Sequence, residues 1–254
     1  LKENGETAIL GSAADSWTCQ IPFLGDAYNL ETEAPDFAEK FDAGEAKWAT
    51  TPEGLRGFEK LEDTIPYYNE DYLATTYDDG CDMMANGKAA HWIVQTKVLG
   101  VINDLYDIDV VNNIRVFPIP SDDAEVNGLT LAYPKAVYGN KNSEKEEAIL
   151  EFMEFYISDE ALDAYFGANS PIGPVCIKDY EIPGDGYDAI TEDIQPYVDE
   201  GKTAPALEYI SPVKGADCAS ICQELVSGQI TAEEAAEKYD KDCEKQATQL
   251  GLDW

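Results

Sequence analysis

The sequence predicts an α/β fold, and its hydrophobic patterning is the reason. Short apolar runs, each the length of a single strand, alternate along the chain with longer segments whose apolar residues recur at helical spacing. A chain that alternates in this way builds a sheet with helices packed against it. At 254 residues the chain can bury about three quarters of its unfolded surface, either as one large domain or as two smaller lobes.

The first half of the chain contains the end of a helix, followed by alternating strands and helices. The expected elements are a final helical turn over 1–5, a strand over 7–10, a helix from Thr51, a helix over 78–86, a strand over 89–94, a helix over 98–106 and a strand over 113–119. Pro52 suits the first turn of its helix, and Gly87 suits the end of the next one. Pro118 and Pro120 close the last strand, which indicates a crossing between two lobes.

The second half of the chain is richer in helix signals. The expected elements are a strand over 128–137, a helix from Ser143, a short helix over 158–167, a proline and glycine crossing over 169–174, a helix that ends at Gly228 and a helix from Thr231. Glu146 and Glu234 stand three residues after two of these starts, which predicts a capping box at each. The apolar faces expected to reach the core are Ile149, Phe152, Met153 and Tyr156 on one helix and Ala235, Ala236 and Tyr239 on the other.

The charge of the chain excludes two classes of partner. Seventeen basic residues against 51 acidic ones give a formal net charge of −34. A field of this sign repels phosphate backbones and anionic lipid surfaces. No uncharged apolar run approaches the length of about 18 residues that a membrane-spanning helix requires. We therefore expect no binding of nucleic acid and no direct contact with a membrane.

The cysteines do not form a recognisable framework. They are Cys19, Cys81, Cys176, Cys218, Cys222 and Cys243. Cys218 and Cys222 lie four residues apart, so they share a helix face and could bind a metal, pair with Cys243 or simply pack as small apolar side chains. Burial is the interpretation we favour, because free cysteine is among the most buried residue types. A single histidine, His91, cannot build a multi-histidine metal site, so we expect no metal and no cofactor.

Five segments, spread in order over nearly the whole chain, resemble one known family. It comprises the extracellular solute-binding proteins of ABC importers, in their maltose-binding-protein-like, carbohydrate-binding branch. The matching segments are Asp78–Ala90, Val116–Pro120, Asn127–Leu131 with Ser143–Ala148 after it, Pro171–Val175 and Ser227–Ala235. The first is similar to an acidic helix, an N-G-K-A-A turn and a strand of the family. The last looks like the family's closing S-G-x-x-T-x-x-E-A turn and helix.

The resemblance implies a type II periplasmic-binding-protein fold, which has two lobes built from a discontinuous chain. Residues 1–116 and 172–254 would form the C-terminal lobe, and residues 117–171 would be the returning segment of the N-terminal lobe. Family members have further residues ahead of this point, including a signal peptide, so we expect the N-terminal lobe to be incomplete. Phe152 and Phe155 would then lie exposed, and we expect the chain to self-associate or to need the missing part.

The resemblance also implies a sugar-binding cleft, in which aromatic rings stack on pyranose faces and carboxylates or amides bind hydroxyl groups. Asp15 and Trp17 stand on the loop where the family places a cleft aromatic. Asn127, next to Gly128, stands near the hinge. The alternative for Trp17 is a ring that packs beneath its loop.

Two positions depart from the pattern of the family. Gln95 and Lys97 stand where the family usually has a small-residue turn and a tryptophan. The aromatic that often begins the penultimate helix is replaced near Lys214, and Tyr209 could substitute for it. Lysines at the rim could meet the carboxylate of an acidic sugar; the alternative is that each is a solvated surface residue.

We therefore expect the substrate-binding component of an ABC transporter, which captures a carbohydrate or related polar solute and presents it to permease subunits. The resemblance places it outside the cell membrane, either periplasmic or as a lipoprotein whose lipid anchor lies in the missing N-terminal part. The alternatives are a carbohydrate-active enzyme, in which two carboxylates would act as acid and nucleophile, and a structural surface domain. No local catalytic signature supports an enzyme, so we expect no catalytic residues.

Overall fold

The structure is a computed structural model that describes residues 1–132, 137–173, 177–181 and 186–254. Its strands are β1 (Ile9–Leu10), β2 (His91–Trp92), β3 (Leu129–Leu131) and β4 (Thr203–Pro205). Its first helices are η1 (Lys2–Asn4), α1 (Ser16–Cys19), α2 (Ile21–Leu24), α3 (Ala27–Glu33), α4 (Phe37–Asp42), α5 (Pro52–Thr64), η2 (Ile65–Tyr67), α6 (Tyr77–Ala85), α7 (Lys97–Leu105) and α8 (Ile108–Val111). The later helices are α9 (Glu146–Tyr156), α10 (Asp159–Phe166), η3 (Ala189–Ile194), α11 (Gln195–Asp199), α12 (Leu207–Ile210), α13 (Cys218–Val226) and α14 (Ala232–Leu250).

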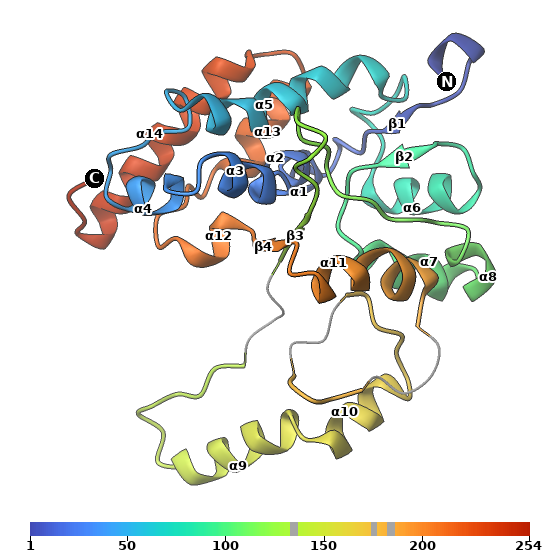
Figure 1. The fold of residues 1–254 in the computed structure, drawn as a ribbon, viewed down its shortest axis with the longest axis vertical. Coiled ribbons are helices and arrows are strands. Elements are labelled where there is room, and N and C mark those ends of the chain that lie inside the picture. Colours follow the sequence, from blue (N-terminus) through green and yellow to red (C-terminus); the bar gives the residue numbers. More distant parts are fainter. Residues whose placement is uncertain (133–136, 174–176, 182–185) are drawn as a thin grey trace.

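The strands form two parallel pairs, each joining segments far apart in the chain. In the first pair Leu10 of β1 lies opposite Trp92 of β2, and Tyr68 forms a further parallel bridge to Ile9. In the second pair β3 runs alongside β4, with Leu129 opposite Thr203. Parallel strands need long crossover connections, which the helices between them supply (Figure 1). The predicted α/β fold is confirmed, although each strand is shorter than its apolar run.

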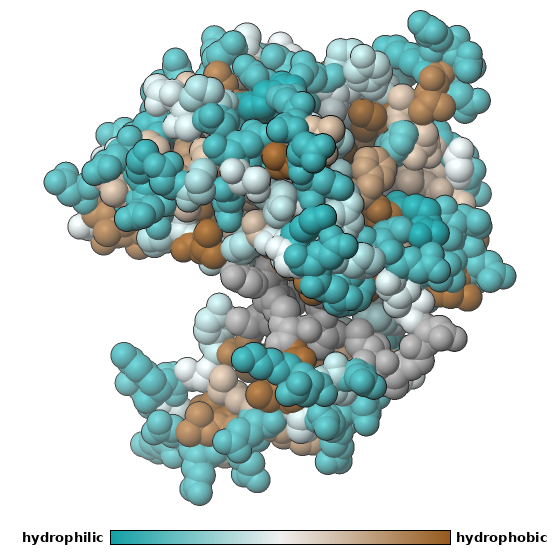
Figure 2. Space-filling model, viewed as in Figure 1, coloured by the Kyte–Doolittle hydropathy of each residue, from teal (hydrophilic) through white to brown (hydrophobic). Residues whose placement is uncertain are grey.

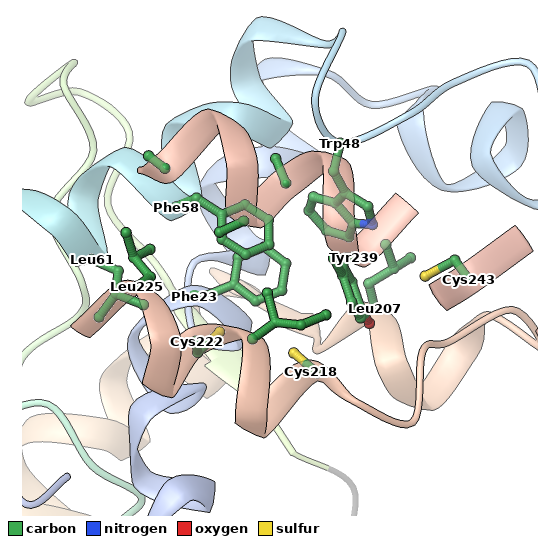
Figure 3. Packing of buried hydrophobic residues seen from close by; sticks show 14 of the residues in the cluster. Phe23, Trp48, Phe58, Leu61, Leu207, Cys218, Cys222, Leu225, Tyr239 and Cys243 are labelled. Atoms are coloured by element: carbon green, nitrogen blue, oxygen red, sulfur yellow. The ribbon is translucent and has the colours of Figure 1, made fainter. Parts of the chain in front are cut away.

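The main hydrophobic core lies between α5, α13 and α14 and the short helices α1 to α4 (Figure 3). Its centre is aromatic: the rings of Phe23 and Phe58 stack with centroids 3.9 Å apart, and Trp48 lies edge-on 4.8 Å from Phe23. Leu61, one turn after Phe58, is fully buried. The helix predicted from Thr51 therefore turns Phe58 and Leu61 into the core. Burying such aromatic side chains supplies most of the driving force for this part of the fold.

A second, smaller core holds α6, α7, α8 and η3 together. Ile102 of α7, Val111 of α8 and Ala189 of η3 are each fully buried in it. Trp92 of β2 packs against this cluster and lies directly on Gly80, where a Cβ atom would fall 2.6 Å from the indole ring. Gly80 is thus required for α6 to approach β2.

Helices α9 and α10 form an arm that projects away from both cores (Figure 1). Neither helix has a buried residue. Phe152 and Phe155 are 55% and 50% exposed, which confirms that this segment leaves its aromatic face uncovered. Figure 2 shows apolar residues on the arm and a hollow between it and the body above. The prediction that Phe152 and Tyr156 reach a core is wrong for this chain, because no sheet lies against them.

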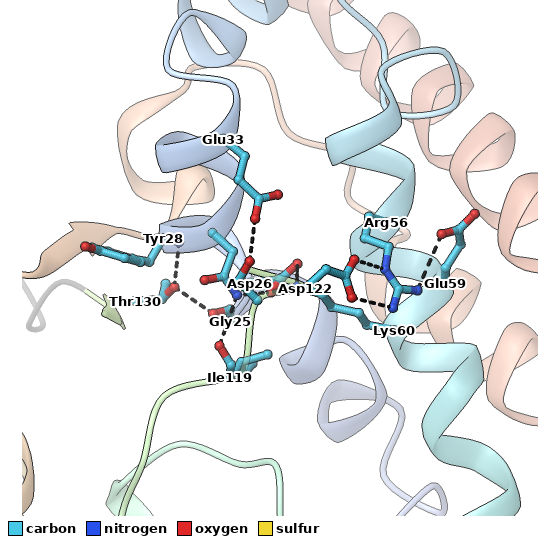
Figure 4. A network of polar contacts seen from close by, with 12 residues as sticks. Gly25, Asp26, Tyr28, Glu33, Arg56, Glu59, Lys60, Ile119, Asp122 and Thr130 are labelled. Atoms are coloured by element: carbon cyan, nitrogen blue, oxygen red, sulfur yellow. Dashed lines mark hydrogen bonds and ion pairs between the residues drawn. The ribbon is translucent and has the colours of Figure 1, made fainter. Parts of the chain in front are cut away.

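Polar contacts fasten the segment between α8 and β3 to the body (Figure 4). The Arg56 guanidinium binds both carboxylate oxygens of Asp122, at 2.7 and 3.1 Å. Nearby, the amide of the buried Asn29 donates to the carbonyl of Ile119 at 3.0 Å. Thr130 of β3 completes the attachment: its hydroxyl donates to the Gly25 carbonyl at 2.6 Å. These bonds hold β3 beside the start of α3.

Residues 113–119 do not form the predicted strand. Asn113 lies in a turn, and the N–H group of Val116 donates to the Asp193 carboxylate at 2.9 Å and not to a neighbouring strand. Pro118 and Pro120 have no N–H group to offer a ladder. The segment therefore crosses the molecule held by side chains, while β3 is the first paired element after it.

The helix expected from Ser143 begins three residues later, so the predicted capping box is wrong. Lys145 is the N-cap of α9, and the Ser143 hydroxyl accepts the N–H group of Lys145. The chain makes a turn from Asn140 to Ser143 before the helix can start. The second capping box is confirmed, with Thr231 and Glu234 each satisfying the backbone N–H group of the other. The strand expected over 128–137 is paired at β3, and residues 133–136 lie outside the described ranges.

Five cysteines, Cys19, Cys81, Cys218, Cys222 and Cys243, are buried as free thiols. The neighbouring Cys218 thiol and burial raise the pKa of Cys222. No cluster of three or more potential metal ligands occurs among the residues that the structure describes. Cys176 and its neighbours 174–175 fall outside those residues. No helix in the described ranges is long and apolar enough to cross a membrane.

Candidate functional site

The candidate site lies at the carboxyl edge of the β1–β2 pair. Because the two strands are parallel, the loop after Leu10 and the loop after Trp92 leave the sheet on the same side. The first loop leads into α1 and the second into α7. Ligands of open α/β sheets bind beyond the carboxyl ends of the strands. Of the predicted site residues, this edge carries Asp15, Trp17, Gln95 and Lys97.

Asp15 connects the first loop to α6. Its carboxylate accepts the backbone N–H group of Tyr77 at 2.7 Å, and its carbonyl accepts both the N–H group and the hydroxyl of Thr18. The carboxylate thereby satisfies a free donor at the start of α6. Asp15 therefore positions Trp17 against Tyr77. One carboxylate oxygen of Asp15 is already used in the hydrogen bond to the Tyr77 N–H group.

Trp17, Tyr77 and Lys97 form one aromatic and cationic cluster. The rings of Trp17 and Tyr77 lie 5.0 Å apart between centroids, tilted by 55°. The Lys97 ammonium lies 4.0 Å from the centre of the Trp17 ring and 5.5 Å from that of Tyr77. Trp17 is half-buried and Lys97 is exposed. Part of the Trp17 side chain therefore reaches the surface, and its contact with a ligand stays a prediction.

Tyr77 is the site residue that sequence reasoning missed. It is the first residue of α6, after the N-cap Thr76, which forms a capping box with Asp79. Burial raises the pKa of its hydroxyl, which lies beside the Cys81 thiol. Its ring also lies 5.5 Å from Trp92. Tyr77 lies inside the T-x-x-D capping signal over 76–79, which predicts where the helix begins but not the contact of this ring with Trp17.

Gln95 stands between β2 and α7, where its backbone carbonyl accepts the N–H group of Val98 at 3.2 Å. Gln95 is half-buried and lies two residues before Lys97 in the sequence. Asn127 lies elsewhere, just before β3, and its amide oxygen accepts the hydroxyl of Tyr197 at 3.4 Å. The contacts of Asn127 thus belong to the β3–β4 pair and not to the Trp17 cluster.

Tyr209 and Lys214 belong to a third place, at and after α12. The Lys214 ammonium donates to the carbonyl of Glu208 at 3.1 Å, and its backbone N–H group donates to Gln246. Burial raises the pKa of Glu208, while the neighbouring Lys214 opposes this rise. Lys214, Glu208 and Trp48 are among the residues that line a small pocket. The predicted site residues therefore fall into three groups, and in the Trp17 group a lysine ammonium lies over the aromatic ring itself.

This fold, in which parallel strand pairs are joined by helical crossovers, is the type II periplasmic-binding-protein fold. The chain belongs to the bacterial extracellular solute-binding proteins, whose family profile matches residues 1–163. The resemblance identified from the sequence is confirmed. No protein with a curated description matches the sequence.

Solved structures of binding proteins share the fold. The chain is similar to a chitin oligosaccharide binding protein, with 20% identity and a TM-score of 0.70 over 97% of this chain. It is also similar to a putative binding protein, MsmE from Bacillus subtilis, with 13% identity and a TM-score of 0.73 over 99% of this chain. A third similar structure is RafE in complex with raffinose, with 14% identity and a TM-score of 0.71 over 96% of this chain. The chain spans 62% of the length of each of these proteins.

Proposed function

We propose that the chain is the substrate-binding component of an ABC importer and captures a carbohydrate outside the membrane. The observation that carries this proposal is the half-buried Trp17 ring, braced by Tyr77 at the carboxyl edge of parallel strands. An aromatic face held in this way suits the apolar face of a pyranose ring. The family match and the sugar-binding proteins among the similar structures support the same assignment.

In this proposal the protein binds and performs no chemistry. Residues 1–116 and 172–254 form one lobe, and residues 117–171 are the part of the opposite lobe that this chain carries. The solute draws the lobes together, so ligand and closed form stabilise each other, and permease subunits recognise the closed shape. Such a protein acts in the periplasm or at the cell surface, held there by a lipid anchor.

Within carbohydrates, we propose an acidic sugar as the solute. Lys97 supplies a positive charge at the aromatic face in a protein with a formal net charge of −34. A carboxylate on the sugar would form a charge-assisted hydrogen bond with this ammonium. Lys214 supplies a second positive charge near α12, where its ammonium donates to the carbonyl of Glu208, the residue before Tyr209.

The experiment compares Trp17→Ala with Trp17→Phe on the full-length gene product. Melting temperatures are recorded with a panel of neutral and acidic disaccharides and trisaccharides. Because a phenylalanine keeps a stacking face, we expect Trp17→Phe to retain most of any carbohydrate-induced rise in Tm. We expect Trp17→Ala to bind the carbohydrate about tenfold or more weakly, and to show a smaller rise in Tm. Equal responses of both variants and the unmodified protein would place the sugar elsewhere and overturn this site.

A further inference from the structure

The Lys97 ammonium occupies the aromatic face on which a sugar ring would stack. It lies 4.0 Å from the centre of the Trp17 ring and 5.5 Å from that of Tyr77. These positions are attractive for a cation, because the face of an aromatic ring carries negative charge. The two residues are 80 positions apart in sequence, and the β1–β2 pairing brings their loops together.

Lys97 is one of seven basic residues in the described ranges that form no ion pair, and with Lys47 it is one of two that lie over an aromatic ring instead. Most of the described lysines and arginines are paired with a carboxylate within 4.0 Å: Lys40, Arg56, Lys60, Lys88, Arg115, Lys202, Lys238, Lys241 and Lys245. Within the described ranges no ion pair involves Lys97, although acidic residues outnumber basic ones three to one, 51 against 17. The carboxylate of Asp15, on the same loop as Trp17, accepts the Tyr77 N–H group.

We propose that Lys97 is the specificity-determining residue of this site, acting as a charged gate on the Trp17 face. A neutral ring can stack on Trp17 only after it displaces the ammonium, and its hydroxyl oxygens offer that ammonium weaker hydrogen bonds than a carboxylate does. A ring that carries a carboxylate displaces the ammonium and pairs with it at once. The gate therefore selects uronic acids and rejects neutral sugars of the same shape.

This inference rests on the proposed function, because it presumes that a sugar stacks on Trp17. Beyond the proposed function, the inference assigns two opposite effects to the Lys97 side chain. Lys97 strengthens the binding of acidic rings and weakens the binding of neutral ones. A lysine that is only a solvated surface residue would do neither.

The test uses a panel of uronic-acid disaccharides, each beside its methyl ester, which has the same shape without the charge. Affinities are measured by calorimetry on the full-length gene product and on Lys97→Ala and Lys97→Arg. We expect Lys97→Ala to weaken binding of the acids about tenfold and to strengthen binding of the esters about threefold. Lys97→Arg retains the preference for the acids, since it keeps a cation that lies on aromatic faces.

Lys47→Ala is the matched control, since the Lys47 ammonium lies over the ring of Trp254, away from the strand edge. It should leave both affinities unchanged. The preference for acids should also fall with added salt in the unmodified protein and not in Lys97→Ala. If the unmodified protein binds each ester as tightly as its acid, or Lys97→Ala changes both alike, the gate is refuted while carbohydrate capture stands. If neither acids nor neutral sugars bind any of these proteins, the proposed function itself is wrong.

Discussion

The Lys97 ammonium lies 4.0 Å from the centre of the Trp17 ring, although the two residues come from different crossover units of the chain. The parallel pairing of Leu10 with Trp92 is what joins them, because it directs the loops after both strands to one edge. Tyr77, held by the Asp15 carboxylate, closes the cluster from a third segment. The contact between Lys97 and Trp17 depends on the register of β1 and β2, so it can form only when these two strands are paired.

The approach of Tyr28 to Gly128 should make a side chain at position 128 costly. A Cβ atom there would fall 2.1 Å from the Tyr28 ring. We expect Gly128→Ala to destabilise the protein by about 1–3 kcal/mol, measured by urea unfolding, because the ring must move. Adding Tyr28→Ala should recover most of the cost that Gly128→Ala imposes. A double variant in which the two losses simply add would contradict this contact.

The buried pair of Asp26 and Lys60 should make the stability of the protein depend on pH. Burial raises the pKa of Asp26 above its usual value, and the Lys60 ammonium, 2.8 Å away, opposes that rise. Lys60→Met leaves the carboxylate buried without its partner, which we expect to cost about 3 kcal/mol near neutral pH. A carboxyl whose pKa is higher folded than unfolded stabilises the fold at low pH and loses this contribution as pH rises through the folded pKa.

The stability deficit of Lys60→Met should therefore be small near pH 4 and grow towards pH 7. Chemical unfolding of this variant and the unmodified protein across that range measures it. Lys60→Arg, which keeps the charge, is the control and should show a much smaller deficit. A deficit that is the same at both ends of the range would mean that the Asp26 carboxylate is not the source.

Asp193 should contribute more to stability than Arg115, its partner. The Arg115 guanidinium lowers the pKa of Asp193, and the same carboxylate also accepts the Val116 N–H group at 2.9 Å. We expect Asp193→Ala to lose about 2 kcal/mol and Arg115→Ala to lose less, since Asp193→Ala also frees the backbone donor of Val116. A lowered pKa means that this contribution is present at neutral pH and is lost as pH falls through the folded pKa. Equal losses for the two variants would show that the backbone bond contributes nothing.

The arm formed by α9 and α10 should govern association of this chain. Phe152 and Phe155 lie about one turn apart on α9 and are both at least half exposed. We expect concentration-dependent association in sedimentation experiments, and we expect Phe152→Lys with Phe155→Lys to abolish it. Glu147→Lys changes the charge of the same helix without touching its apolar face and should leave association in place. A chain that stays monomeric at all concentrations would show that this face does not self-associate.

Local signals predicted the helices well, because caps and glycine stops act within a few residues. Thr231 with Glu234, Ser158 and Gly87 each stand where α14, α10 and α6 begin or end. The strand expected over 113–119 failed for a non-local reason: a carboxylate 77 residues away takes the N–H group of Val116. Short helices such as α1 to α4 have too few turns for periodicity to show.

The candidate site was predictable only in part. Asp15, Trp17 and Lys97 were expected near a ligand, and the parallel pairing of β1 with β2 brings their loops to one edge. Tyr77 was missed, since its place depends on the Asp15 carboxylate and not on any pattern around it. Asn127 and Lys214 have partners elsewhere, and whether they reach the solute remains a prediction.

The measurement that tests the central claim most directly is a thermal-shift screen of the full-length gene product against neutral sugars, uronic acids, amino acids, dipeptides and nucleosides. A ligand at a hundredfold excess over its Kd stabilises the folded state by about 2.7 kcal/mol, which shifts Tm by several degrees. The account predicts hits confined to carbohydrates, strongest among uronic acids and clearly weakened in Trp17→Ala. Stabilisation by an amino acid, dipeptide or nucleoside, or by no carbohydrate at all, would contradict it.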